Sequence, residues 1–153
     1  MNKAYDRLKW VFLEAILLKL GFKPEWVNMI MACVSSVKYK VRYNSVEPET
    51  IKPSCGLRQG DPLSPYLFLL CIEGLTTLLN HAEQLGELVG VKVCRDAPSG
   101  TTLLFANDSL ILMKANVQNA TCLKSLLDLY CGASGQLVSV DKSRIFFGPS
   151  TEC

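Results

Sequence analysis

The sequence has few of the ligands that a zinc site requires. His81 is the one histidine, and no two of the seven cysteines form a C-x-x-C pair. Because zinc sites cluster thiolate and imidazole ligands, the sequence argues against zinc. Cysteines inside apolar runs pack as small hydrophobic residues, and cysteines without an obvious pairing pattern are typical of a reducing compartment. We therefore expect an intracellular protein, in the cytoplasm or the nucleus.

Long apolar runs and an excess of one charge are also missing. The longest apolar run, residues 67–72, is far too short to span a bilayer, so we expect no membrane segment. The first seven residues lack the apolar core of a signal peptide. A formal net charge of +2 does not by itself indicate nucleic-acid binding. Local basic clusters at 38–42 and 142–144, taken alone, are most simply solvated strand faces.

What the sequence does contain is enough apolar material for one core, 49% of 153 residues. Helical periodicity, proline and glycine predict helices at 7–19, 25–34, 65–82 and 116–132. Alternation and turn signals predict strands at 37–44, 46–52, 89–94 and 145–147, a turn at 97–100 and a hairpin around 107–108. Helices mixed with short antiparallel strands predict an α+β fold.

Finer expectations concern the ends and faces of these helices. Ser64 is a good N-cap with Pro65 as the first helical residue, after a loop at 54–65 shaped by two glycines and two prolines. Gly132 and Gly135 should end the last helix. The predicted apolar side of the first helix consists of Leu8, Val11, Phe12, Ala15 and Leu18.

Phe105-Ala106-Asn107-Asp108 lies between two apolar runs and predicts a β-hairpin with a polar turn. Asn and Asp both suit ordinary turns, so the tetrapeptide alone indicates no chemistry. An acidic hairpin tip can also hold a divalent cation, because Mg²⁺ prefers carboxylate oxygen. The tip offers a single carboxylate, that of Asp108.

Four blocks in a fixed order decide between these interpretations. They are K-A-Y-D-R at 3–7, G-L-R-Q-G-D-P-L-S-P-Y-L-F at 56–68, F-A-N-D at 105–108, and S-G-Q at 134–136 followed by K-S at 142–143. In this order the blocks closely resemble the reverse transcriptase of non-LTR (LINE-type) retrotransposons, with plant elements most similar. The resemblance covers almost the whole chain, and its 58–68 block is highly specific.

The resemblance implies RNA-directed DNA synthesis by nucleotidyl transfer with two Mg²⁺ ions. The family holds these ions with an aspartate on a first palm strand and an aspartate pair on the hairpin. Asn107 stands in the first place of that pair and Asp108 in the second. The first-strand aspartate would fall one place before Met1, and Asp6 is expected to make a structural polar contact. We therefore expect Asp108 as the catalytic metal ligand, Asn107 as a degenerate catalytic position, and doubtful Mg²⁺ binding.

Other site residues follow from the resemblance one at a time. Tyr5 matches the aromatic residue under the incoming sugar; the alternative is an ordinary core aromatic. Gln59 and Gly60 match the loop against nucleotide and template, and Arg58 could contact phosphate or be a surface guanidinium. Lys142 matches a lysine that can protonate the leaving pyrophosphate.

The implied partners are an RNA template, a DNA primer and deoxynucleoside triphosphates. The implied fold is a reverse-transcriptase palm spanning residues 1–153, with an antiparallel sheet packed on helices and truncated at its first strand. Fingers, thumb and endonuclease are expected to be absent. Because carboxylates are missing, we expect an inactive polymerase; the alternatives are a non-catalytic nucleic-acid-binding remnant and a functionless translated relic.

Overall fold

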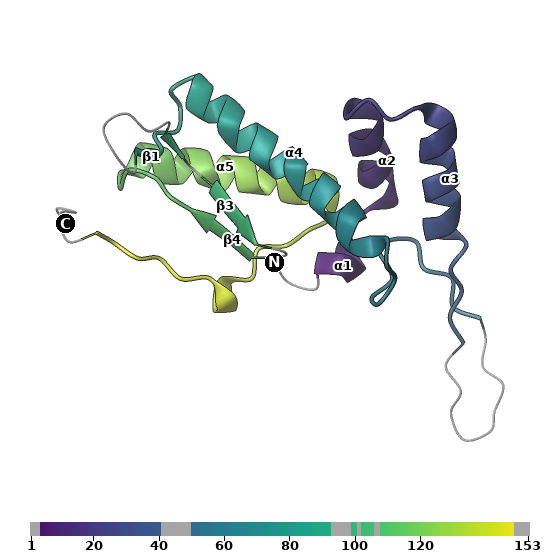
Figure 1. The fold of residues 1–153 in the computed structure, drawn as a ribbon. Coiled ribbons are helices and arrows are strands. Elements are labelled where there is room, and N and C mark those ends of the chain that lie inside the picture. Colours follow the sequence, from purple (N-terminus) through teal and green to yellow (C-terminus); the bar gives the residue numbers. More distant parts are fainter. Residues whose placement is uncertain (1–3, 41–49, 93–98, 101, 106–107, 149–153) are drawn as a thin grey trace.

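Helices form most of the fold, and short strands occupy its middle (Figure 1). The structure is a computed structural model that describes residues 4–40, 50–92, 99–100, 102–105 and 108–148. The elements in chain order are α1 (Ala4–Arg7), α2 (Trp10–Lys19), α3 (Pro24–Ser35), α4 (Ser64–Gln84), β1 (Val91–Lys92), β2 (Ser99–Gly100), β3 (Thr102–Phe105), β4 (Asp108–Ile111), α5 (Val117–Ser134) and a 3-10 helix, η1 (Val140–Lys142).

Three of the predicted helices are present with small changes at their ends. Pro24 begins α3, since its fixed backbone angle suits a first helical turn. Asn116 caps α5, because its side chain accepts a hydrogen bond from the Asn119 amide at 2.7 Å. Gly135 ends α5 in the left-handed conformation, at φ 80°. The expectation that Gly132 also ends this helix was wrong, because Gly132 lies inside it.

The first predicted helix was wrong in two respects. It is divided, because Leu8 and Lys9 separate α1 from α2. Its buried side is formed by Leu13 and Leu17, whereas Val11 is 78% exposed. Apolar residues surround α2 almost completely, so sequence periodicity did not single out the side that packs on α4.

Ser64 does not cap α4. Leu63 is the N-cap. Ser64 is the first residue of the helix, and it is buried. The carboxylate of Asp61 instead accepts a hydrogen bond from the Leu63 amide at 2.8 Å. The loop before α4 is therefore closed by a carboxylate three residues upstream of Ser64, the position that the sequence favoured as the cap.

The strands form two antiparallel pairs. In the hairpin, Thr102 pairs with Ile111 and Phe105 with Asp108, so the two residues between the strands match the shortest common hairpin connection. β1 pairs with β2, and Ser99-Gly100 is thus a strand where the sequence predicted a turn. Of the predicted strands at 37–44 and 46–52, the structure describes one bridge, Tyr39 to Ile51; residues 41–49 lie outside the described part. Of the predicted strand at 89–94, the structure describes a strand at Val91–Lys92, and Val93 and Cys94 lie outside the described part.

The last predicted strand is wrong. Residues 145–147 form no regular element, and Ile145, Phe146 and Phe147 are 82%, 88% and 71% exposed. A β-branched and aromatic triplet has strand propensity, but propensity needs a partner strand to become structure.

No helix of the described residues combines the length and apolarity needed to cross a membrane.

Two apolar clusters share α4 as their common wall. The first joins the start of α4, through Leu67, Phe68, Cys71 and Ile72, to α2 and α3. The second joins the later residues Leu75, Leu79 and Ala82 to Tyr130 of α5. Phe12 of α2 packs against both clusters, and its ring meets that of Tyr130 edge to face at 5.7 Å. The coarse prediction of mixed helices and a small antiparallel sheet is confirmed.

Candidate nucleic-acid interface and metal hairpin

The short helix α1 is tied to two distant segments through its own carbonyl groups. A four-residue helix leaves its carbonyls without helical partners, and tertiary donors satisfy them here. The Leu57 amide donates to the Tyr5 carbonyl at 2.7 Å, and the Gly56 amide donates to the Leu8 carbonyl at 2.8 Å. From the other side, Nε2 of the buried Gln136 donates to the Ala4 carbonyl at 2.7 Å. The first, second and fourth sequence blocks therefore meet at α1.

Gly56 makes this close approach possible. Its φ of +90° lies in the region that side chains disfavour, and a Cβ there would come within 2.8 Å of the Asp6 carbonyl oxygen. The Gly56 carbonyl in turn accepts a hydrogen bond from the indole of Trp10 at 2.7 Å. The glycine at the start of the second block is thus required by packing, independently of any ligand.

Tyr5 is half-buried and stacked on Phe68. The ring centroids lie 4.9 Å apart at an interplanar angle of 23°. Phe68 belongs to α4 and to the first apolar cluster, so the ring of Tyr5 is supported from below by the core. This arrangement fits both meanings that the sequence left open, a core aromatic and a ring that limits the space for a sugar.

Arg58, Gln59 and Gly60 are exposed on the loop that leads to α4. The Gln59 side chain donates from Nε2 to Oδ1 of Asp6 at 3.2 Å. Asp6 therefore makes the polar contact that was expected of it. Within the described part of the chain Arg58 forms no ion pair, which leaves its guanidinium available to a phosphate.

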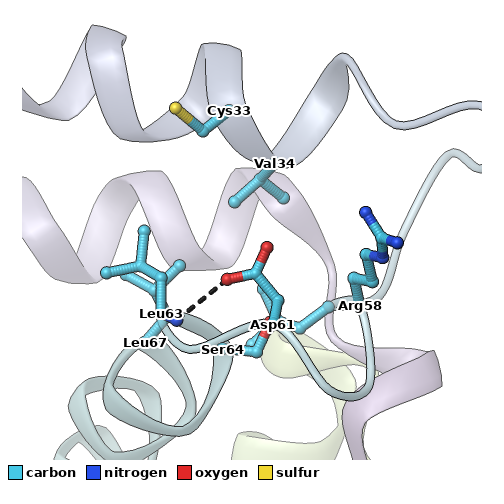
Figure 2. A pocket seen from close by; sticks show the side chains of 8 residues that line it. Cys33, Val34, Arg58, Asp61, Leu63, Ser64 and Leu67 are labelled. Carbon is cyan, nitrogen blue, oxygen red and sulfur yellow. Dashed lines mark hydrogen bonds between the residues drawn. The ribbon is translucent and has the colours of Figure 1, made fainter.

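A small pocket lies beside this loop, between it and α3. Its volume is about 30 Å³, which suffices for one or two water molecules. Figure 2 shows the Asp61 carboxylate pointing toward Val34, bonded to the Leu63 amide, while Arg58 extends away from it. A nucleotide is far too large for this pocket, so a nucleic acid could contact only the exposed side of the loop.

The hairpin presents one carboxylate. Asp108 is exposed at the first position of β4, opposite Phe105. Asn107, the degenerate catalytic position, lies outside the described residues. Asp108 therefore sits directly beside the two-residue connection, as the hairpin prediction required.

The side chains available for Mg²⁺ do not fit a two-ion site. Among the residues that the structure describes, no three His, Cys, Asp or Glu side chains gather in a group that could hold a metal. An amide at position 107 supplies a carbonyl oxygen without charge, and Mg²⁺ depends on few carboxylates. Asp108 alone is too weak a donor set for two ions.

Lys142 lies in η1 and is exposed. Within the described part of the chain its ammonium group forms no ion pair and makes no hydrogen bond to Asp108 or Arg58. The structure therefore brings together Tyr5, Arg58, Gln59 and Gly60 through α1 and its loop, whereas Asp108 and Lys142 lie on separate elements. Their catalytic and binding roles stay predictions.

Sequence reasoning placed Gln136 in the fourth block but assigned it no role in this region. Its side chain is fully buried, and its Oε1 atom has no hydrogen-bond partner among the described residues. The signal that could have identified this role was its place directly after Ser134 and Gly135 in that block, because a glutamine buried among apolar neighbours needs a specific partner.

Comparison with known proteins agrees with this arrangement. A family model described as reverse transcriptase (RNA-dependent DNA polymerase) matches residues 1–152. An uncharacterized mitochondrial protein of Arabidopsis thaliana is 48% identical over 66 residues, which are 43% of this chain and 54% of that protein. The chain thus spans about half of that relative.

Two further relatives are much longer than this chain. An uncharacterized 149 kDa protein of transposon TX1 from Xenopus laevis is 26% identical over 93% of this chain and 10% of its own length. A retrovirus-related Pol polyprotein from the type-1 retrotransposable element R2 of Nasonia vitripennis is 30% identical over 58% of this chain and 9% of its own length. With a family match over almost the whole chain, these relatives confirm the retrotransposon resemblance, and the chain belongs to the reverse transcriptase family.

Proposed function

We propose that this chain is a reverse-transcriptase palm that binds an RNA template paired with a DNA primer and does not extend the primer. One observation carries the proposal: the loop that would bind nucleic acid is held in place, while the hairpin has an asparagine where the family has a metal-binding aspartate. The loop at 56–60 is held to α1 by backbone hydrogen bonds, whereas the hairpin offers Asp108 alone.

Binding is supported by the groups that the loop exposes. Arg58 presents a guanidinium that matches the geometry of a phosphate, and Gly60 has no atom within 4 Å of where a Cβ would stand. An open glycine lets a ligand backbone approach closely. Tyr5, supported by Phe68, supplies an aromatic edge to the same region. Lys38, Lys40 and Lys142 add exposed positive charge elsewhere on the molecule.

Absence of extension follows from the donor chemistry of the hairpin. Nucleotidyl transfer in this family relies on two metal ions, which stabilise the attacking and leaving oxygens. Replacing one hairpin carboxylate by an amide removes a formal negative charge where the ions would sit. Without a leaving pyrophosphate, the ammonium group of Lys142 has no leaving group to protonate, and we assign it to phosphate contact.

The test is a titration of an RNA/DNA hybrid against the protein across a range of salt concentrations. Each phosphate contact adds to the slope of affinity against salt, because counterions are released on binding. Arg58→Ala should lower that slope by about 1. Lys19→Ala, which removes an exposed cation from the last turn of α2, is the matched control and should change it less. An affinity that does not respond to salt would contradict the proposal.

A further inference from the structure

The two ends of the Gln59 amide are chemically different, and Asp6 decides which one faces outward. An ionised carboxylate only accepts hydrogen bonds, while a glutamine amide donates from nitrogen and accepts at oxygen. With Oδ1 of Asp6 at 3.2 Å, the end of Gln59 that faces it must be Nε2. The remaining end, Oε1, is then an acceptor on an exposed side chain.

Asp6 is itself held firmly against the loop that carries Gln59. The Asp6 carbonyl faces Gly56 so closely that a Cβ on Gly56 would lie 2.8 Å from it, and it also accepts a weak bond from the Cys55 thiol at 3.5 Å. The carbonyls of Tyr5 and Leu8, one residue before and two residues after Asp6, also accept from loop amides. The backbone of Asp6 therefore cannot move away from the loop without breaking hydrogen bonds, which fixes the point from which its carboxylate reaches Gln59.

We infer that Asp6 is a positioning residue, which holds the Gln59 amide with its oxygen outward to accept a hydrogen bond from a nucleic-acid ligand. The inference rests on the proposed function, because it needs the loop to bind an RNA/DNA hybrid. Fixing one long side chain before binding lowers the entropy lost when the ligand is bound. It also favours a ligand group that donates a hydrogen bond over one that accepts.

The direction of the expected effect separates this role from simple electrostatics. Removing a negative charge beside a nucleic-acid site should tighten binding, since phosphates are negative. If Asp6 positions Gln59, Asp6→Ala should instead weaken binding of an RNA/DNA hybrid about three- to tenfold, the worth of one oriented hydrogen bond. Glu14→Ala removes an exposed carboxylate from α2 with the same charge change, and should leave affinity equal or slightly tighter.

A double-mutant cycle shows whether Asp6 acts through Gln59. In the Gln59→Ala background, Asp6→Ala should cause no further loss of affinity, because the side chain that it positions is gone. A purely structural role of Asp6 would give the same loss in both backgrounds. Asp6→Asn keeps the side-chain size but lets the amide of Gln59 turn either way, so its affinity for the hybrid should lie between those of the wild type and Asp6→Ala. This variant also serves as a control for misfolding of α1.

Nuclear magnetic resonance of the Gln59 side-chain amide gives a readout independent of affinity. Its two proton resonances should shift in Asp6→Ala and stay in place in Glu14→Ala. Additive losses in the cycle, or equal affinities for Asp6→Ala and Glu14→Ala, would overturn the positioning role while leaving hybrid binding intact. Failure of the wild-type protein to bind the hybrid is a different result, which would overturn the proposed function and the inference together.

Discussion

Gly56 is the residue on which the contact between α1 and its loop depends most directly. Its positive φ and the missing Cβ both serve the approach to the Asp6 carbonyl. Gly21 has a similar φ of +87° but has no atom within 4 Å of a Cβ position. A side chain would strain the backbone at both glycines, but it would clash with a neighbouring atom only at Gly56.

Gly56→Ala should destabilise the protein clearly more than Gly21→Ala. Both substitutions place a side chain at positive φ, which costs about 1–2 kcal/mol. At Gly56 the new Cβ also meets the Asp6 backbone, and the total cost should rise to about 3 kcal/mol. Denaturant unfolding of the two variants measures the difference. Equal losses of stability would show that α1 does not pack on this loop as described.

The buried thiol of Cys71 should make the protein less stable as the pH rises into the alkaline range. Burial raises the pKa of the Cys71 thiol from 9.0 to about 12. The unfolded chain therefore loses this proton near pH 9 while the folded chain keeps it. The contribution of the protonated thiol to the free energy of unfolding is fully present below pH 9. It is lost as the pH rises toward 12, and the total loss is roughly 4 kcal/mol.

Unfolding free energies measured at pH 8 and pH 11 test this fall. Burial also raises the pKa of the neighbouring Tyr130 hydroxyl, so part of the fall belongs to the tyrosine. Cys71→Ala should make the fall shallower, and Cys33→Ala, which removes an exposed thiol, should not. An unchanged pH dependence in Cys71→Ala would contradict the burial of this thiol.

At the scale of elements, α5 is joined to the strands by one buried side chain. Asn119 is 2% exposed, accepts from the Val89 amide at 3.3 Å and donates to the Lys114 carbonyl at 2.8 Å. The segments that contain Val89 and Lys114 also bond each other, at 2.9 Å between amide and carbonyl. Asn119 thus fixes where α5 begins relative to β1 and β4.

Asn119→Ala should cost about 1–3 kcal/mol, because it removes two part-buried hydrogen bonds, one from the Val89 amide and one to the Lys114 carbonyl. Asn80→Ala, at an exposed position of α4, should be close to neutral. Thermal unfolding of the two variants compares them directly. A nearly neutral Asn119→Ala would mean that water replaces both bonds.

Helix positions could largely be predicted from the sequence, because proline, asparagine and glycine act locally at helix ends. Pro24, Asn116 and Gly135 each act as their type predicts. The prediction failed at Ser64, which lies inside α4 after the N-cap Leu63, and at residues 145–147, which have strand-forming side chains but no strand partner among the described residues. In the candidate site, the order of the sequence blocks identified the loop and the hairpin. The hydrogen bond between Asp6 and Gln59 could not be predicted in this way, because the two residues are 53 positions apart in the chain.

At the scale of the whole molecule, α4 connects the candidate binding loop to the rest of the fold. The loop leads into its first turns, Phe68 in those turns stacks on Tyr5, and its later turns pack on α5 (Figure 1). Gly74 marks the crossing with α2, where a Cβ would come within 3.1 Å of Ile16. Under the proposed function, a loop supported in this way binds nucleic acid independently of any chemistry at the hairpin.

Primer extension tests the central claim most directly. A DNA primer annealed to an RNA template is incubated with the protein, deoxynucleoside triphosphates and either Mg²⁺ or Mn²⁺. Asp108→Ala serves as the control, since Asp108 is the remaining hairpin carboxylate. The account predicts that the wild-type protein binds the hybrid and incorporates no more nucleotide than Asp108→Ala does. Robust incorporation by the wild-type protein that is lost in Asp108→Ala would contradict it.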